Sequence, residues 1–152
     1  MAMFSIDVSY SQISVFNSLL DNPFNNWTPQ HVAQGFSWRP GSVSFKTLID
    51  SGPICVEVRM AEALPMPTGT RAISVPFVCP LGGTVEVSSI TGGQETDIPP
   101  GNYQLLFETG SRDEINWCRF TFVHNGVMMP MVLIPDEEVG QLDSFLMDAE
   151  PA

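Results

Sequence analysis

Hydrophobic and polar residues alternate along much of this chain. In residues 54–60, Ile54, Val56 and Val58 fall on one face of an extended backbone, and Glu57 falls on the other. Because side chains alternate between the two faces of a strand, this period of two predicts a strand with one buried face. The same pattern recurs in four further segments, residues 73–79, 85–88, 103–108 and 117–122.

Turn residues divide the chain between these segments. Residues 81–84 and the Asn-Gly pair at 125–126 are short enough to predict hairpins, and Asn-Gly is the preferred pair of a type I′ turn. Pro76 lies inside a strand pattern, so we expect its strand to be an edge strand or to carry a bulge. Weaker strand patterns occupy residues 5–10, 13–16, 42–49 and 127–134. About eight short strands predict an all-β fold, an antiparallel β-sandwich, with a barrel as the alternative.

Two segments depart from the strand pattern. Residues 28–35 predict a helix of about two turns, because Thr28 suits the N-cap, Pro29 the first turn and Gly35 the terminus. Residues 135–147 begin with acidic residues and continue with apolar residues at helical spacing, so they predict either a C-terminal helix or a mobile tail. We therefore divide the chain into a sandwich domain, 1–134, and an acidic C-terminal extension, 135–152.

The balance of charges is strongly acidic. Seventeen Asp and Glu residues oppose six Lys and Arg residues, which gives a net charge of −11, although 43% of the residues are hydrophobic as in a packed domain. Such a protein repels nucleic acid and attracts basic proteins. We expect a basic protein partner and no direct binding of nucleic acid. The alternative is that the charge only maintains solubility.

The cysteines and the N-terminal residues predict a compartment. Cys55, Cys79 and Cys118 lie in strand-like runs without paired spacing, so we expect buried core residues rather than disulfides, which favours a reducing compartment. The N-terminal residues lack a basic and apolar leader pattern, and the apolar runs are too short to span a bilayer. The sequence therefore predicts a cytoplasmic protein without a transmembrane segment.

Catalytic motifs are missing from the sequence. No phosphate-binding loop, nucleophile elbow or metal-ligand spacing occurs, and His31 and His124 are far apart. We predict no enzymatic activity, no metal site and no cofactor. One hydrolase hypothesis stays open, because Glu57, Glu86 and Glu108 lie on polar strand faces and two of them in a cleft would resemble a glycosidase pair. Solvated outward positions are the favoured interpretation of these three glutamates.

The acidic clusters and one tryptophan are candidates for contact with a partner. The clusters are either solvated turns or the rim of an interface with a basic protein, where charges speed association. Trp117 alternates with the core residues of its strand, so its ring is a candidate anchor. The same exposed ring also favours an alternative function as a small-ligand or carbohydrate-binding module. The predicted contact residues are Asp113, Glu114, Asp136, Glu137, Glu138 and Trp117.

Several segments together resemble a known family. These segments are residues 8–16 (VSYSQISVF), 26–35 (NWTPQHVAQG), 41–45 (GSVSF), 75–77 (VPF), 83–90 (GTVEVSSI) and 98–105 (IPPGNYQL). Their order and spacing are similar to the competence protein J family, also called Nin, the inhibitor of the DNA-entry nuclease of bacterial transformation. The resemblance covers residues 8–109, about two thirds of the chain.

The resemblance implies a function without catalysis. It implies an intracellular or membrane-associated protein that binds and inhibits a DNase, and an immunity protein against a DNase toxin is a related possibility. The matching residues are turn, cap and core types, so they carry over a fold and no binding residue. A DNase needs a basic cleft for its polyanionic substrate, so an acidic inhibitor can act as a DNA mimic, with carboxylates in place of phosphates.

Overall fold

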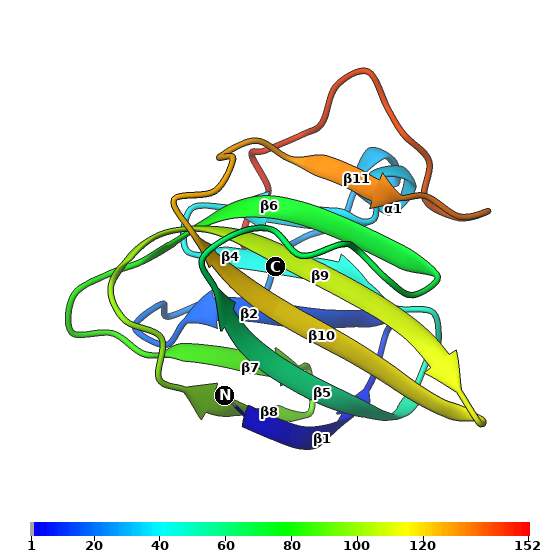
Figure 1. Cartoon of the computed structure of the whole chain (residues 1–152), viewed down its shortest axis with the longest axis horizontal. Coiled ribbons are helices and arrows are strands. Elements are labelled where there is room, and N and C mark those ends of the chain that lie inside the picture. The colour runs from blue at the N-terminus through cyan, green and yellow to red at the C-terminus, as the bar shows by residue number, and fades with distance from the viewer. Residues whose placement is uncertain (1) are drawn as a thin grey trace.

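Two β-sheets lie face to face in the computed structural model, which describes residues 2–152 (Figure 1). Neighbouring strands are antiparallel except for one parallel pair, β5 and β10. The predicted all-β sandwich is confirmed. The six-stranded sheet has the order β1 (Ala2–Val8), β5 (Gly52–Ala61), β10 (Ile115–His124), β9 (Gly101–Arg112), β6 (Arg71–Cys79) and β11 (Met131–Ile134). The five-stranded sheet has the order β3 (Phe36–Arg39), β4 (Ser42–Lys46), β2 (Gln12–Asn17), β7 (Val85–Ser89) and β8 (Gly92–Thr96).

The hydrophobic core fills the space between the two sheets. Ile54, Val56 and Val58 of β5 are buried in it, as their alternation predicts. Phe45 of β4 stacks on Phe107 of β9, with 4.6 Å between ring centroids, and so joins the two sheets. The remaining side chains of β5, β10 and β9 point to the outer face of the six-stranded sheet, where the charged groups described below lie.

The short helix α1 (Pro29–Gln34) forms as predicted. Thr28 is its N-cap, and the backbone N–H of Thr28 donates to Nδ1 of His31 at 3.0 Å, which completes a capping box. Burial lowers the pKa of His31, and the nearby Asp148 carboxylate opposes this effect. Gly35 ends the helix at φ +85°, where an added Cβ would lie 2.8 Å from Ile73 and Val139. The helix terminus therefore packs directly against the core.

Both predicted hairpins are wrong. Residues 81–84 connect β6 of one sheet to β7 of the other, and β11 pairs with β6 rather than with β10 across the Asn-Gly turn. Asn125 adopts a positive φ of 52°, but Gly126 is not among the glycines with positive φ, so the predicted type I′ turn does not form and the strand that follows has a different neighbour. The actual type I′-like turn joins β9 to β10, where both Asp113 and Glu114 have positive φ.

The strand pattern did not predict two of the strands, and the expectation for Pro76 holds only in part. β3 is missed because its four residues follow the predicted helix directly, and β8 is missed because Gly92–Thr96 contains no apolar residue. Pro76 lies in β6, which is an inner strand by order. However, β11 pairs with β6 only as far as Ser74, so Pro76 faces no strand on that side. There the indole N–H of Trp38 donates to the carbonyl of Pro76 at 2.7 Å.

Residues 135–147 contain no helix, so the predicted C-terminal helix is wrong. Val139 is fully buried, and the side chain of Gln34 exchanges two hydrogen bonds with the backbone of Leu146, at 3.0 and 2.9 Å. Further on, Pro151 forms a β-bridge with Asn25. Side-chain partners on the sandwich thus replace the hydrogen bonds of a helix. Within residues 2–152, no helix has the length and apolar character needed to cross a membrane.

Candidate functional site

The predicted contact residues Asp113 and Glu114 form the tip of the β9–β10 hairpin. The tip projects at one end of the six-stranded sheet (Figure 1). Both side chains are exposed, and neither forms an ion pair with another described residue. The tip is therefore free to meet a partner.

Asp136 and Glu138 are used inside the protein instead. Arg71 of β6 is completely buried, and its Nη2 lies 2.8 Å from Asp136 and 3.0 Å from Glu138. Lys46 adds a second cation 3.2 Å from Glu138. Glu137 lies between the two paired acids in sequence, is exposed, and forms no ion pair with a described residue. Of this cluster, Glu137 alone presents an unpaired carboxylate.

The acidic end is our name for the end of the sandwich that carries the hairpin tip. β5 runs parallel to β10, with Cys55 opposite Trp117, so the first residues of β5 lie at the same end as the tip that precedes β10. Asp50 comes just before β5. Asp7 of β1 lies opposite Pro53 at the same end. The acids of the acidic end without an ion pair to a described residue are Asp7, Asp50, Asp113 and Glu114. Glu137 follows β11 at the other edge of the same sheet, where its neighbours Asp136 and Glu138 contact Arg71 of β6.

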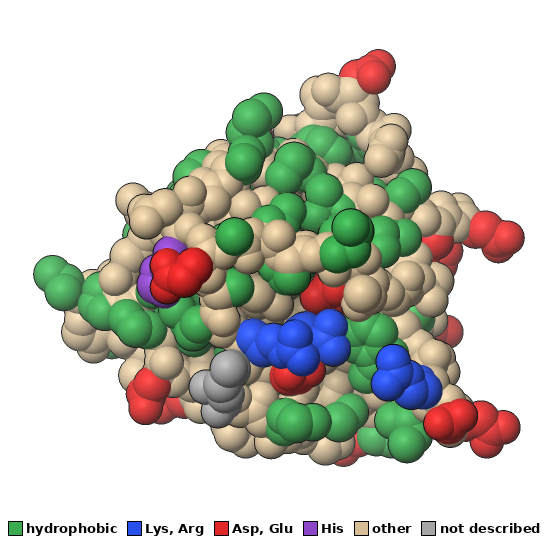
Figure 2. Space-filling model, viewed as in Figure 1, with side chains coloured by type: hydrophobic (Ala, Val, Ile, Leu, Met, Phe, Trp, Pro, Cys, Tyr) green, Lys and Arg blue, Asp and Glu red, His purple; other side chains and the backbone are tan. Residues whose placement is uncertain are grey.

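The negative charge is not confined to the acidic end. Glu95 and Asp97 are exposed at the opposite end of the sandwich, next to Ala2 and Arg59. Figure 2 shows the outer face of the six-stranded sheet, with carboxylates mostly at its margin and Lys and Arg side chains near its middle. The outer face itself is therefore not an acidic surface.

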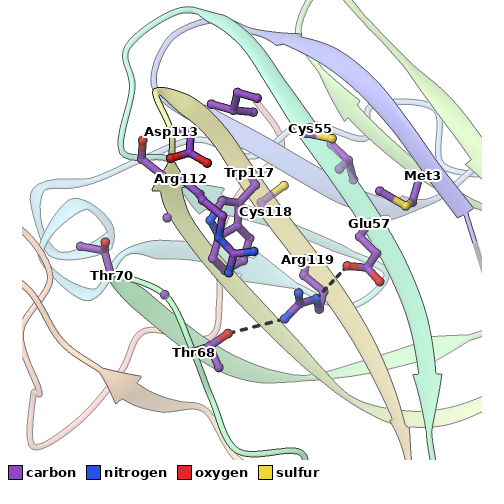
Figure 3. Close-up of a pocket in the computed structure, with 15 residues that line it drawn as sticks. Met3, Cys55, Glu57, Thr68, Thr70, Arg112, Asp113, Trp117, Cys118 and Arg119 are labelled. Carbon is purple, nitrogen blue, oxygen red and sulfur yellow. Dashed lines mark hydrogen bonds and ion pairs between the residues drawn. The ribbon is translucent and has the colours of Figure 1, made fainter.

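A network of charged side chains occupies the middle of this outer face (Figure 3). Arg119 of β10 lies 3.0 Å from Glu57 of β5 and 3.6 Å from Glu108 of β9. The other carboxylate oxygen of Glu108 accepts hydrogen bonds from the backbone N–H and hydroxyl of Thr68, at 2.7 and 2.8 Å. Sequence reasoning treated the loop that carries Thr68 as surface, and no pattern in it indicates this contact.

The solvated position predicted for Glu108 is wrong. Only 1% of this residue is exposed, because the loop between β5 and β6 crosses over it. Partial burial works to raise the pKa of Glu57, but hydrogen bonds and charge from Arg119 and Arg59 outweigh it and lower that pKa. A general acid needs a raised pKa, and Glu86 lies on the other sheet, so the network does not suit a glycosidase pair.

The lowered pKa of Glu57 predicts a specific acid dependence of stability. A carboxyl whose pKa falls on folding stabilises the protein above its ordinary value of 4.5, and this contribution is lost as the pH falls through the folded value. Replacing Glu57 with Gln should therefore lower the melting temperature more at pH 6 than at pH 3. Thermal unfolding at both pH values measures this. The control is Glu86→Gln, and an equal loss for Glu57→Gln at both pH values would contradict the prediction.

A hollow of about 620 Å³ lies between this network and the hairpin tip. Trp117 and Arg119 of β10 line it together with Cys55 of β5. Cys79 and Cys118 are buried, as expected, whereas Cys55 is only partly buried. Burial raises the pKa of the Cys118 thiol, and all three cysteines are free. Among residues 2–152, no group of His, Cys, Asp and Glu side chains is placed to hold a metal ion.

Comparison with known proteins gives consistent matches. The family model described as Competence protein J (ComJ) matches residues 5–123, which include the hairpin tip and Trp117. The DNA-entry nuclease inhibitor of Bacillus subtilis (strain 168) is 24% identical over 100 residues, which are 66% of this chain and 75% of that protein. The crystal structure of ComJ, inhibitor of the DNA-degrading activity of NucA, from Bacillus subtilis, matches with a TM-score of 0.72 and 21% identity. It covers 82% of this chain and 96% of that one.

Proposed function

Because this chain belongs to the competence protein J family, we propose that it is a non-enzymatic inhibitor of a DNA-degrading nuclease. The observation that carries the proposal is the family match across nearly all strands of the sandwich. The curated relative and the solved structure are both named as nuclease inhibitors, which supports the same activity here. We infer a nuclease of the same class as NucA, which serves either DNA uptake or, as a toxin, competition between bacteria.

The charge distribution supports a basic cleft as the target. Among the described residues, four of the six basic side chains are held in internal ion pairs, with only four of the seventeen carboxylates. Most carboxylates are thus available to replace phosphates in a DNA-binding cleft. Asp113, Glu114 and Glu137 are the proposed contacts, and Asp136 and Glu138 act indirectly by holding Glu137 in place.

The proposal is tested by mixing the purified protein with NucA of Bacillus subtilis and measuring cleavage of plasmid DNA. Cleavage should fall as the protein approaches an equal molar concentration. A restriction endonuclease in the same buffer is the control, and its cleavage should not change, because the protein is proposed to bind the nuclease and not the DNA. Undiminished cleavage by NucA at tenfold excess of the protein would overturn the proposal.

A further inference from the structure

The Trp117 hollow, as we call the 620 Å³ hollow described above, lies directly beside the hairpin tip. Asp113 lines it, as do Thr68 and Thr70 of the loop between β5 and β6 (Figure 3). No other described hollow combines this volume with a tryptophan ring. Its size is within the range of sites that bury a bound group.

The indole ring of Trp117 is held against two glycines. A Cβ added to Gly110 would lie 3.0 Å from the ring, and one added to Gly69 would lie 3.1 Å from it and 2.6 Å from the carbonyl of Thr109. Gly69 also has a φ of +90°, which disfavours any other residue. The guanidinium of Arg119 lies 5.3 Å from the ring centroid. The ring is thus fixed before a partner arrives, and a fixed Trp beside an Arg is typical of interface hot spots.

Most of the charged side chains at the Arg119 side of the hollow are already paired with one another. Arg119 is paired with Glu57 and Glu108, so it does not require an anion from a partner. Arg112 also lines the hollow and forms no ion pair with a described residue. Its positive charge would repel a Lys or Arg side chain of a partner that entered the hollow. Besides Arg112, the features of the hollow without a partner are its apolar surface, where Ile115 at the rim is 60% exposed, and the two free carboxylates of the adjoining tip.

We propose that the Trp117 hollow receives an aromatic or large aliphatic side chain of the nuclease, from a loop whose flanking Lys or Arg residues contact Asp113 and Glu114. This inference rests on the proposed function and adds to it the place of contact. The apolar side chain packs against the indole ring, and the flanking Lys or Arg side chains form ion pairs with the two carboxylates that have no partner in the free protein. Basic loops are expected on a protein that binds DNA.

Two variants remove the apolar contact in different ways. Ile115→Glu places a charge at the exposed rim, and Trp117→Ala removes the ring. We expect the concentration of protein that halves NucA cleavage to rise at least tenfold for Ile115→Glu and at least thirtyfold for Trp117→Ala. The matched control is Ile90→Glu, because Ile90 is an exposed isoleucine on the turn after β7 of the other sheet. Its inhibition should equal that of the unchanged protein.

The outcomes separate this inference from the proposed function. Unchanged inhibition by Ile115→Glu would overturn the hollow as the contact site, while inhibition by the original protein would still support the function. No inhibition by the original protein would overturn both. Thermal unfolding shows whether Trp117→Ala folds. If it does not, the inhibition measured for Ile115→Glu alone decides whether the hollow is the contact site. Hydrogen exchange gives a second measurement, since NucA should protect residues 110–117, and protection only at residues 92–97 would overturn the inference.

Discussion

Replacing Arg71 with Ala is expected to lower the free energy of unfolding by about 3–5 kcal/mol, the range for breaking a buried ion pair. The guanidinium of Arg71 is fully buried and binds Asp136 as well as the backbone carbonyl of Lys46, at 2.7 Å. Its removal leaves the Asp136 carboxylate, which is only 14% exposed, without a cation. The side chain also links β6 to the end of β4 and to the C-terminal segment, so one substitution loosens three elements.

Chemical denaturation measures this loss, and the melting temperature of a chain this size should fall by about 6–20 °C. Arg112→Ala is the control, because Arg112 is exposed and forms no ion pair with a described residue, so it should change stability by less than about 0.5 kcal/mol. A double-mutant cycle with Asp136→Asn should give a coupling of about 1 kcal/mol or more. Equal losses for Arg71→Ala and Arg112→Ala would contradict the prediction.

Local chemistry made the strands and the helix predictable from the sequence. The alternation around Val56 and the cap residues Thr28 and Gly35 act through neighbouring backbone, so they can be recognised without knowing the fold. Strand partners are a different matter. Asn125 adopts the positive φ that its residue type favours, yet Gly126 does not and β11 pairs with β6, because a local turn preference does not decide which strand edge is free.

The candidate site was less predictable for the same reason. Asp136, Glu137 and Glu138 are alike in sequence, and only the position of Arg71, 65 residues earlier than Asp136, separates the paired acids from the free one. Glu108 follows the outward period of its strand correctly, but a loop crosses above it. An outward direction is therefore a weak guide to exposure when long loops lie on the outer face of a sheet.

Neutralising the hairpin tip is expected to slow association with the nuclease about tenfold at low ionic strength. The change is Asp113→Asn with Glu114→Gly, which removes two negative charges. Both positions have positive φ, and Asn-Gly is the preferred pair for a type I′ turn, so the fold should be at least as stable as before. Slower binding by an equally stable protein would then be an effect of charge alone.

Stopped-flow or surface-binding kinetics with NucA measures the association rate, and the control is Glu95→Gln with Asp97→Asn. This pair lies at the opposite end of the sandwich and changes the net charge by the same amount. If net charge alone steered the encounter, both double variants would slow association equally. If the acidic end makes the contact, only the tip variant slows it, and the difference should disappear near 1 M salt, where the screening length is about 3 Å. Equal rates for the two variants at low salt would therefore exclude the hairpin tip as the contact.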